Sequence, residues 1–201
     1  MKLYYSPGAC SLAPHIALRE AGLAFEPVLT PTKTHQTPDG TDYYTINPLG
    51  YVPLLELDDG TRLREVPAIL QYVADQVPTR NLAPANGTLP RYRLQEWLNF
   101  VATELHRSFG PLFNPAFSDD TKKFFRERIT GRLQFVDQEL QGRQYLMGEN
   151  FTVADAYLFT VSRWAKPMAI DLAPHANLVA WQQRVAARPA VQAALKLENL
   201  T

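Results

Sequence analysis

The stretch MKLYYSPGACSLAPH, residues 1–15, decides the fold of this chain. Leu3-Tyr4-Tyr5 favours a strand, and Ser6-Pro7-Gly8 is typical of a turn. From Ser11 to Glu20 the apolar residues recur at helical spacing, and Pro14 is tolerated because the first turn of a helix has N–H groups without intrahelical partners. We therefore expect Cys10 at the point where a strand gives way to a helix.

Cys10 is the only cysteine in the 201 residues. The N-terminus of a helix carries a partial positive charge, which favours the thiolate, the reactive form of sulfur. The sequence therefore makes Cys10 a candidate catalytic residue. The alternative is an inert, small and buried side chain, and the pattern leaves both readings open.

The first 77 residues predict a small α/β domain. Helix 12–22 ends at Gly22, as helices often do, and Asp58-Asp59-Gly60 is a hairpin signal. A further helix is expected to begin at Pro67, because proline is favoured at the first helical position. The remaining elements are strands, expected at 2–5, 25–29, 52–57 and 61–64.

The rest of the chain predicts an all-α domain. Residues 78–90 are rich in proline, glycine and asparagine and are interpreted as a linker. Thr152 followed by Asp155 has the form of a helix-capping box, and Gly131 inside a helical pattern suggests close packing there. Within the expected domain 91–201, helical periodicity covers 91–108, 121–140, 153–166 and 177–187.

The composition narrows the class of protein. Lys+Arg and Asp+Glu both number 20, which argues against binding nucleic acid or an anionic membrane as the main role. One cysteine allows no disulfide within the chain, and neither a secretory leader nor an apolar run of about 18 residues is present. We expect a soluble cytoplasmic protein without a metal-ligand cluster.

A polar stripe follows the expected helix 91–108. Asn99, Thr103 and His106 are spaced by four and three residues, which places them on one side of an α-helix. They either form a solvated flank or line one wall of a cleft between the two domains. His106 is the residue best suited to a proton or charge role near neutral pH.

The stretch NPLGYVP, residues 47–53, predicts a backbone binding site. Pro53 opens a strand, and a cis Val52–Pro53 bond would turn the Val52 backbone outward, where it could pair with a peptide-like ligand. Glu65 could receive an ammonium group, and the Val66 N–H could donate to a carboxylate at a helix start. The alternative for Glu65 is an ordinary acid that complements the helix dipole.

Over essentially its whole length the chain resembles bacterial glutathione transferases of the cysteine-containing beta class. The resemblance implies a thioredoxin-like N-terminal domain, an all-helical C-terminal domain, a homodimer, and glutathione as a substrate. The order and spacing of several motifs carry it: YYSPGACSL at 4–12, NPLGYVP at 47–53, EVPAI at 65–69, EWLNF at 96–100 and FTVADAYLF at 151–159.

The resemblance also implies roles for individual residues. Cys10 would meet the glutathione sulfur, Val52 would pair with the cysteinyl backbone, and Pro53 would be the cis proline. Glu65 and Val66 would hold the γ-glutamyl end. The active-site wall would consist of Asn99, Thr103, Glu104 and His106.

Four positions depart from the family pattern. His35 and Leu49 stand where lysine is common, Tyr51 where glutamine is common, and Val66 where glycine or serine is usual. Each lost charged partner would cost about 1.5–3 kcal/mol, so two losses would weaken affinity more than about a hundredfold. We therefore expect weaker glutathione binding than is usual in the family, and a branched side chain at Val66 in a tight site.

Three functions follow as hypotheses. The first is a glutathione transferase that conjugates glutathione to hydrophobic electrophiles, a detoxification role. The second is a monothiol glutathione-dependent disulfide oxidoreductase, because Ala13 stands where a second cysteine would complete C-x-x-C. The third is a non-catalytic binding protein on the same fold.

Overall fold

The computed structural model describes residues 1–200, which form two compact units. The first unit comprises Met1–Ala83 together with the chain from Ala187 onward, and the second comprises Pro84–Ala186.

The first unit is built on a four-stranded mixed sheet in the order β2-β1-β3-β4. Strand β1 pairs in parallel with β2 and antiparallel with β3, with Leu3 opposite Leu55, and β3 pairs antiparallel with β4. This is the thioredoxin-like arrangement that the resemblance implied. The elements are β1 (Lys2–Tyr5), α1 (Leu12–Ala21), β2 (Glu26–Leu29), η1 (Tyr43–Thr45), β3 (Leu54–Glu56), β4 (Arg62–Leu63), α2 (Val66–Asp75) and η2 (Pro78–Arg80).

Apolar side chains from the sheet and from α1 form the core of this unit. Leu3, Leu54 and Leu55 are fully buried, as is Ile16 on α1. Helix α1 ends at Gly22, whose φ of 68° is a left-handed conformation that glycine adopts without steric cost. The predicted strand–turn–helix entry to the fold is therefore confirmed, and it sets Cys10 between β1 and α1.

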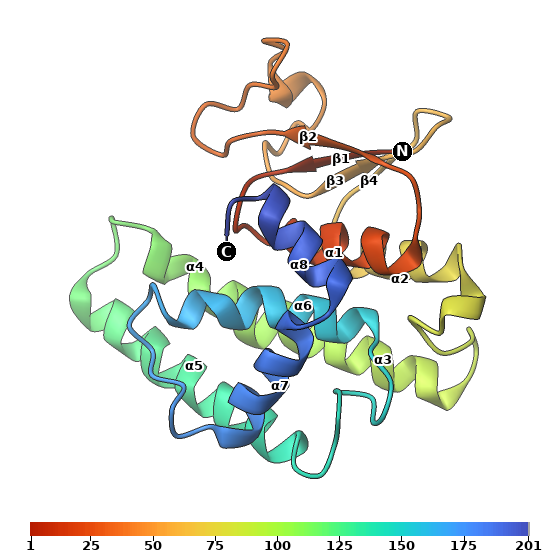
Figure 1. Ribbon diagram of the computed structural model, residues 1–201. Coiled ribbons are helices and arrows are strands. Elements are labelled where there is room, and N and C mark those ends of the chain that lie inside the picture. Colours follow the sequence, from red (N-terminus) through yellow and green to blue (C-terminus); the bar gives the residue numbers. More distant parts are fainter. Residues whose placement is uncertain (201) are drawn as a thin grey trace. The chain divides into compact units, whose positions relative to one another are not determined.

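The last helix, α8 (Pro189–Leu197), packs against α1 and belongs to the first unit, as Figure 1 shows in blue beside red. Val191 and Ala194 are fully buried, and Arg188 donates to both oxygens of Glu20 at 2.6 and 2.9 Å. This division differs from the expected ranges 1–77, 78–90 and 91–201. Local periodicity shows that a segment is helical but does not show which core its apolar face joins.

The second unit contains no strand within its described residues. Thr88 caps the first helix by accepting a hydrogen bond from the Arg91 N–H, so helix begins inside the expected linker. The elements are α3 (Leu89–Phe100), the π-helical η3 (Val101–His106), α4 (Arg107–Phe113), α5 (Asp119–Glu139), α6 (Val153–Ser162), η4 (Arg163–Ala165) and α7 (Ala176–Ala186).

A buried acid organises the start of α6. Thr152 and Asp155 form the predicted capping box, in which the Thr152 N–H donates to Asp155 Oδ2 at 2.9 Å. Asp155 Oδ1 accepts from the Leu146 N–H and from Trp181 Nε1, at 2.9 and 3.0 Å. The box therefore also ties α6 to α7 and to the loop that precedes it.

Gly131 corrects one expectation. A Cβ atom placed at Gly131 would meet no atom within 4 Å, so no close packing requires glycine in the middle of α5.

Within residues 1–200, no helix combines the length and the apolar character needed to cross a membrane.

Candidate active site

Cys10 lies in the turn between β1 and α1. Its thiol donates a hydrogen bond to the Val52 carbonyl oxygen at 3.3 Å. The Ala9 N–H donates to the Ser6 carbonyl, and the Ala13 N–H donates to the Cys10 carbonyl, both at 3.1 Å. The turn and the first helical bonds thus hold Cys10 beside the segment that contains the expected cis proline.

The ionisation of Cys10 differs from the sequence-based expectation. Burial raises the pKa of the Cys10 thiol to about 12, and the nearby Glu65 carboxylate adds to the rise. The backbone N–H groups of Cys10 and Ser11 lower the pKa, as a helix start should, but desolvation outweighs them. Cys10 is therefore a neutral thiol that donates a hydrogen bond rather than a thiolate.

The Val52–Pro53 peptide bond is cis, which confirms the prediction. The preceding carbonyl oxygen, of Tyr51, accepts from Asn47 Nδ2 at 2.7 Å and from the Tyr43 hydroxyl at 3.0 Å. Tyr43 is fully buried and Asn47 is 1% exposed, so this backbone is anchored from inside the unit. Leu49 and Tyr51 themselves carry exposed side chains.

Glu65 precedes α2 in a conformation that non-glycine residues seldom adopt, with φ 67° and ψ 120°. Its carbonyl accepts from the Ala68 and Ile69 N–H groups, whereas its exposed side chain makes no capping hydrogen bond. Backbone in such regions costs about 1–3 kcal/mol and is concentrated at functional sites. Glu65 is therefore not simply a helix cap.

Val66 is the second position of this segment. Its N–H lies in the first turn of α2, where no intrahelical acceptor exists, so it is placed to meet an anion. Its side chain, however, is 3% exposed. Val66 thus contributes its side chain to the core of the unit, and its role beside a bound ligand stays a prediction.

His35 lies in the long segment between β2 and β3, also with a positive φ of 50°. Its ring packs on Tyr44 with the centroids 4.7 Å apart, and its Nδ1 is buried without a hydrogen-bond partner. The His35 backbone is fixed by hydrogen bonds to Pro31 and from Tyr43. The His35 ring thus rests on Tyr44, while hydrogen bonds anchor its backbone.

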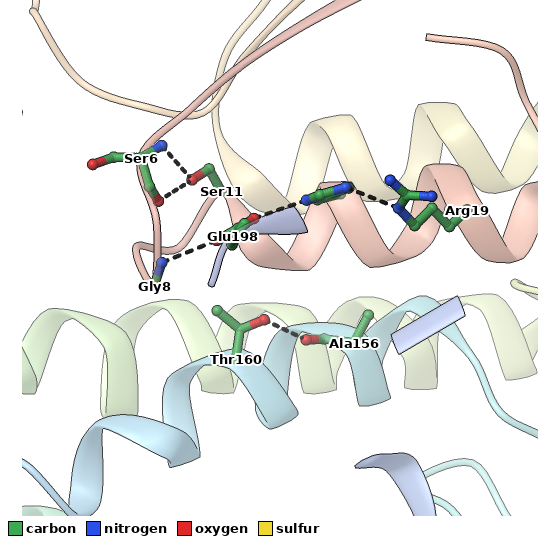
Figure 2. A network of polar contacts seen from close by, with 8 residues as sticks. Ser6, Gly8, Ser11, Arg19, Ala156, Thr160 and Glu198 are labelled. Atoms are coloured by element: carbon green, nitrogen blue, oxygen red, sulfur yellow. Dashed lines mark hydrogen bonds and ion pairs between the residues drawn. The ribbon is translucent and has the colours of Figure 1, made fainter. Parts of the chain in front are cut away.

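A chain of polar contacts runs from the turn of Ser6, Gly8 and Ser11 through Glu198 to Arg19 (Figure 2). Glu198, just after α8, accepts from the Gly8 N–H at 2.9 Å and contacts His15 Nδ1 at 2.8 Å. Arg19 Nε donates to His15 Nε2 at 2.9 Å, so Nδ1 carries the ring proton that Glu198 accepts. The Ser11 hydroxyl completes the turn by bonding both the N–H and the carbonyl of Ser6.

Sequence reasoning missed His15 and Glu198. They are 183 positions apart and are 0% and 1% exposed. The signal in the sequence was that His15 stands among apolar positions of α1 and that Glu198 directly follows the apolar helix α8, which does not identify a partner for either.

The predicted wall residues lie on α3 and η3 of the second unit. The Thr103 hydroxyl donates to the Asn99 carbonyl at 3.0 Å, and both side chains are exposed. Glu104 instead accepts from Arg128 and Arg132 of α5 at 2.9 and 2.7 Å, and the hydrogen bond from Arg132 is the main cause of its lowered pKa. The structure therefore joins Asn99 to Thr103 but pairs Glu104 with the neighbouring helix.

His106 is partly buried among aromatic rings. Its Nδ1 lies 2.7 Å from the Tyr157 hydroxyl, and its ring meets Trp164 edge-on at 5.1 Å between centroids. Burial lowers the pKa of His106 to about 4, and the positive charge of Arg107 adds to this. His106 is therefore uncharged near neutral pH, so it offers a hydrogen bond and not the positive charge considered from the sequence.

Trp164 extends this aromatic group. It also meets Phe109 and Phe113 edge-on, at 5.6 and 5.5 Å between centroids. Phe109 is fully buried, whereas Phe113 is 50% exposed. In residues 1–200 no three His, Cys, Asp or Glu side chains gather as a metal site would require.

Two family models match the chain. Residues 8–76 match the glutathione S-transferase N-terminal domain, and residues 100–189 match the glutathione S-transferase C-terminal domain.

Relatives and solved structures agree with this match. The chain is 47% identical over 200 residues to "Glutathione S-transferase GstA" of Escherichia coli O157:H7, with all of both chains covered. It is 57% identical, at a TM-score of 0.98, to the structure described as a ternary complex of BphK, a bacterial GST, again with full coverage of both. A beta class glutathione S-transferase from Sphingomonas chungbukensis is 48% identical at a TM-score of 0.97, also over the whole of both chains.

Proposed function

The chain belongs to the glutathione S-transferase family, in its bacterial beta class, and on that premise we propose how its residues conjugate glutathione to an electrophile. It is a glutathione transferase, so its reaction joins the sulfur of glutathione to an electrophilic atom. The main support for the proposed site is the hydrogen bond from the Cys10 thiol to the Val52 carbonyl oxygen, 3.3 Å long, beside the cis Pro53.

The first unit supplies groups that match each part of a γ-glutamyl tripeptide. The exposed Glu65 carboxylate complements the α-ammonium, and the Val66 N–H complements the carboxylate beside it. The backbone of Val52, followed by Pro53, offers the antiparallel pairing for the cysteinyl residue. His35 is the candidate for the glycyl carboxylate.

Cys10 acts in this proposal as a hydrogen-bond donor. Its thiol leaves the Val52 oxygen and donates to the sulfur of bound glutathione, which stabilises that sulfur as a thiolate. Burial raises the pKa of the Cys10 thiol to about 12, so the thiol is neutral at pH 7. Disulfide exchange needs an attacking thiolate, so a monothiol oxidoreductase is not favoured. A non-catalytic binding protein is not favoured either, because the similar relatives are glutathione S-transferases.

Aromatic side chains of the second unit are candidates for contact with a hydrophobic molecule. Phe113 and Trp164 form an apolar aromatic surface, and His106 adds a polar group at its edge. Asn99 and Thr103 remain candidates for polar contacts, because both side chains are exposed. Glu104 is proposed to hold Arg128 and Arg132 rather than to touch a substrate.

The proposals on localisation, assembly and biological role rest on the resemblance to the family. We propose a cytoplasmic homodimer with a role in detoxification. Light scattering at micromolar concentration tests the assembly, since a mass of one chain would contradict the dimer.

Calorimetry with Glu65→Gln tests the glutathione site. Losing a charged partner costs about 1.5–3 kcal/mol, so glutathione should bind about ten to one hundred times more weakly. Glu26→Gln is the matched control, because Glu26 is another exposed acid of the same unit at the start of β2. Equal affinity in both variants would overturn the assignment of Glu65, and the absence of any conjugation of a chloronitroaromatic by the parent chain would overturn the function.

A further inference from the structure

We infer that His35 makes the glycyl end of the proposed glutathione site neutral, so that the site binds γ-glutamyl tripeptides with an uncharged C-terminal group almost as well as glutathione. The inference starts from the way in which the His35 ring lies against Gly50. It rests on the proposed function and names the class of thiols that the same site would bind.

The direction of antiparallel pairing places the glycyl end of the ligand. The cysteinyl backbone is proposed to pair with Val52, which precedes the cis Pro53. In an antiparallel pair the two chains run in opposite directions, so the residue after the cysteinyl group lies beside the residues that precede Val52. Those residues are Gly50 and Tyr51, and the glycyl group is therefore expected beside them.

Gly50 encloses one nitrogen of the His35 ring. A Cβ atom placed at Gly50 would come 3.1 Å from His35 Nδ1 and 2.6 Å from the Tyr44 ring, so a side chain at position 50 would collide with both rings. His35 Nδ1 is buried and has no hydrogen-bond partner within residues 1–200. The His35 ring thus packs against the backbone that leads to Val52.

The enclosure of Nδ1 decides which ring nitrogen carries the proton. A neutral imidazole has one N–H donor and one acceptor nitrogen. A proton on Nδ1 would make it a buried donor without an acceptor, whereas Nε2 is not enclosed in this way and can donate to water or to a ligand. Within the described part of the chain no acid is paired with the ring. His35 therefore presents one neutral Nε2–H donor at the glycyl end.

A neutral donor and a cation discriminate differently between ligands. An ammonium group attracts a carboxylate much more than a carboxamide, because only the carboxylate carries a charge. An imidazole N–H can donate to the oxygen of either group. Lys33 is the one Lys or Arg in residues 30–53, and its side chain is exposed. With His35 at the position where lysine is common, the site should therefore prefer the free acid only slightly.

Calorimetry at pH 8, where a histidine without an acidic partner is mostly uncharged, tests the specificity. The two ligands are glutathione and glutathione amide, in which a carboxamide replaces the glycyl carboxylate. We expect the parent chain to bind them within less than about tenfold of each other. His35→Lys should raise the preference for glutathione by about a further tenfold or more, as expected for a charged hydrogen bond.

His35→Gln is the matched control, because a glutamine amide is also a neutral donor and should keep the small preference of the parent chain. Lys33→Gln should keep it as well. A preference for glutathione above about tenfold in the parent chain would overturn the inference, and so would an equal preference in the parent chain and His35→Lys. A preference that changes in Lys33→Gln would show that Lys33, and not His35, sets the charge at the glycyl end.

Nuclear magnetic resonance of the full chain with ¹⁵N-labelled histidine rings tests the tautomer without any ligand. His35→Gln removes one set of signals and so assigns His35 among the four histidines. We expect a protonated Nε2 and an unprotonated Nδ1, and a protonated Nδ1 would overturn the inference. If the parent chain bound neither ligand, the proposed function would fail and this inference with it, whereas a strong preference for glutathione would defeat the inference alone.

Discussion

His15 in the first unit and His106 in the second are both buried or partly buried imidazoles, but their hydrogen bonds differ. His15 is bonded at both nitrogens, by Arg19 and Glu198, and is fully enclosed. His106 is bonded at Nδ1 only, by Tyr157. A histidine with both nitrogens satisfied can only hold structure together, whereas one with a single satisfied nitrogen is oriented and still has a group to offer. The first unit thus uses its histidine to support the Cys10 turn, and the second uses its histidine as a candidate for chemistry.

The largest expected effect comes from breaking the enclosed network. Glu198→Ala should lower the free energy of unfolding by about 3 kcal/mol, because it leaves the His15 Nδ1–H and the Gly8 N–H without their buried acceptor. Urea denaturation measures the change. Glu96→Ala is the control, because the Glu96–Arg93 pair is exposed and solvent screens it, so its loss should change the free energy of unfolding little. Equal losses in the two variants would show that the network does not support the turn.

The reactivity of Cys10 sharpens the description of the first unit. Because burial raises the pKa of the thiol to about 12, its alkylation by iodoacetamide should stay slow at pH 8 and rise steeply only above about pH 11. The rate measured against pH, followed by intact mass, gives the apparent pKa. Half-maximal alkylation below pH 9 would mean that the helix start, and not burial, has the larger effect on the pKa of the Cys10 thiol.

The pH dependence of stability tests His106. Its folded pKa, about 4, lies below the ordinary value of 6.5, so the unfolded chain binds more protons between these limits. The stability contributed by the neutral ring is present above pH 6.5 and is lost as the pH falls toward 4. His106→Phe should therefore show a shallower fall in stability over this range than the parent chain. Parallel curves from urea denaturation would contradict the lowered pKa.

The smallest expected effect comes from a position outside both networks. Gly131→Ala should raise the free energy of unfolding by about 1 kcal/mol, because alanine is a better helix former and its Cβ meets open space. Conjugation rates should not change, which separates stability from activity. A destabilised Gly131→Ala protein would mean that this part of α5 is packed more closely than the structure shows.

Local patterns predicted the features that depend on neighbours in sequence. The strand–turn–helix around Cys10 and the capping box at Thr152 are confirmed, because each is encoded within about ten residues. The cis bond before Pro53 is confirmed as well, but its prediction rested on the family resemblance. The structure differs from the sequence-based expectation where contacts between residues far apart in the sequence determine the packing. The return of α8 to α1 depends on apolar faces from both ends of the chain, and so does the contact between His15 and Glu198.

Burial explains the other departures. The helix start at Cys10 favours a thiolate, but desolvation, which sequence does not show, is the larger influence on its pKa. Val66 has the expected backbone position at the start of α2, yet its side chain enters the core. Sequence located the candidate residues, and only the packing around them showed which protonation state or direction each one has.

The comparison of the two histidines is tested most directly by kcat for glutathione conjugation in His15→Phe and His106→Phe, each corrected for its folded fraction. Removing one hydrogen-bond donor to a developing charge costs about a hundredfold or more in kcat, so His106→Phe should lose about a hundredfold in kcat per folded molecule. His15→Phe should be the less stable protein and should keep kcat within about threefold, because its side chain only supports the fold. The reverse pattern, or equal losses of kcat in both variants, would contradict the account.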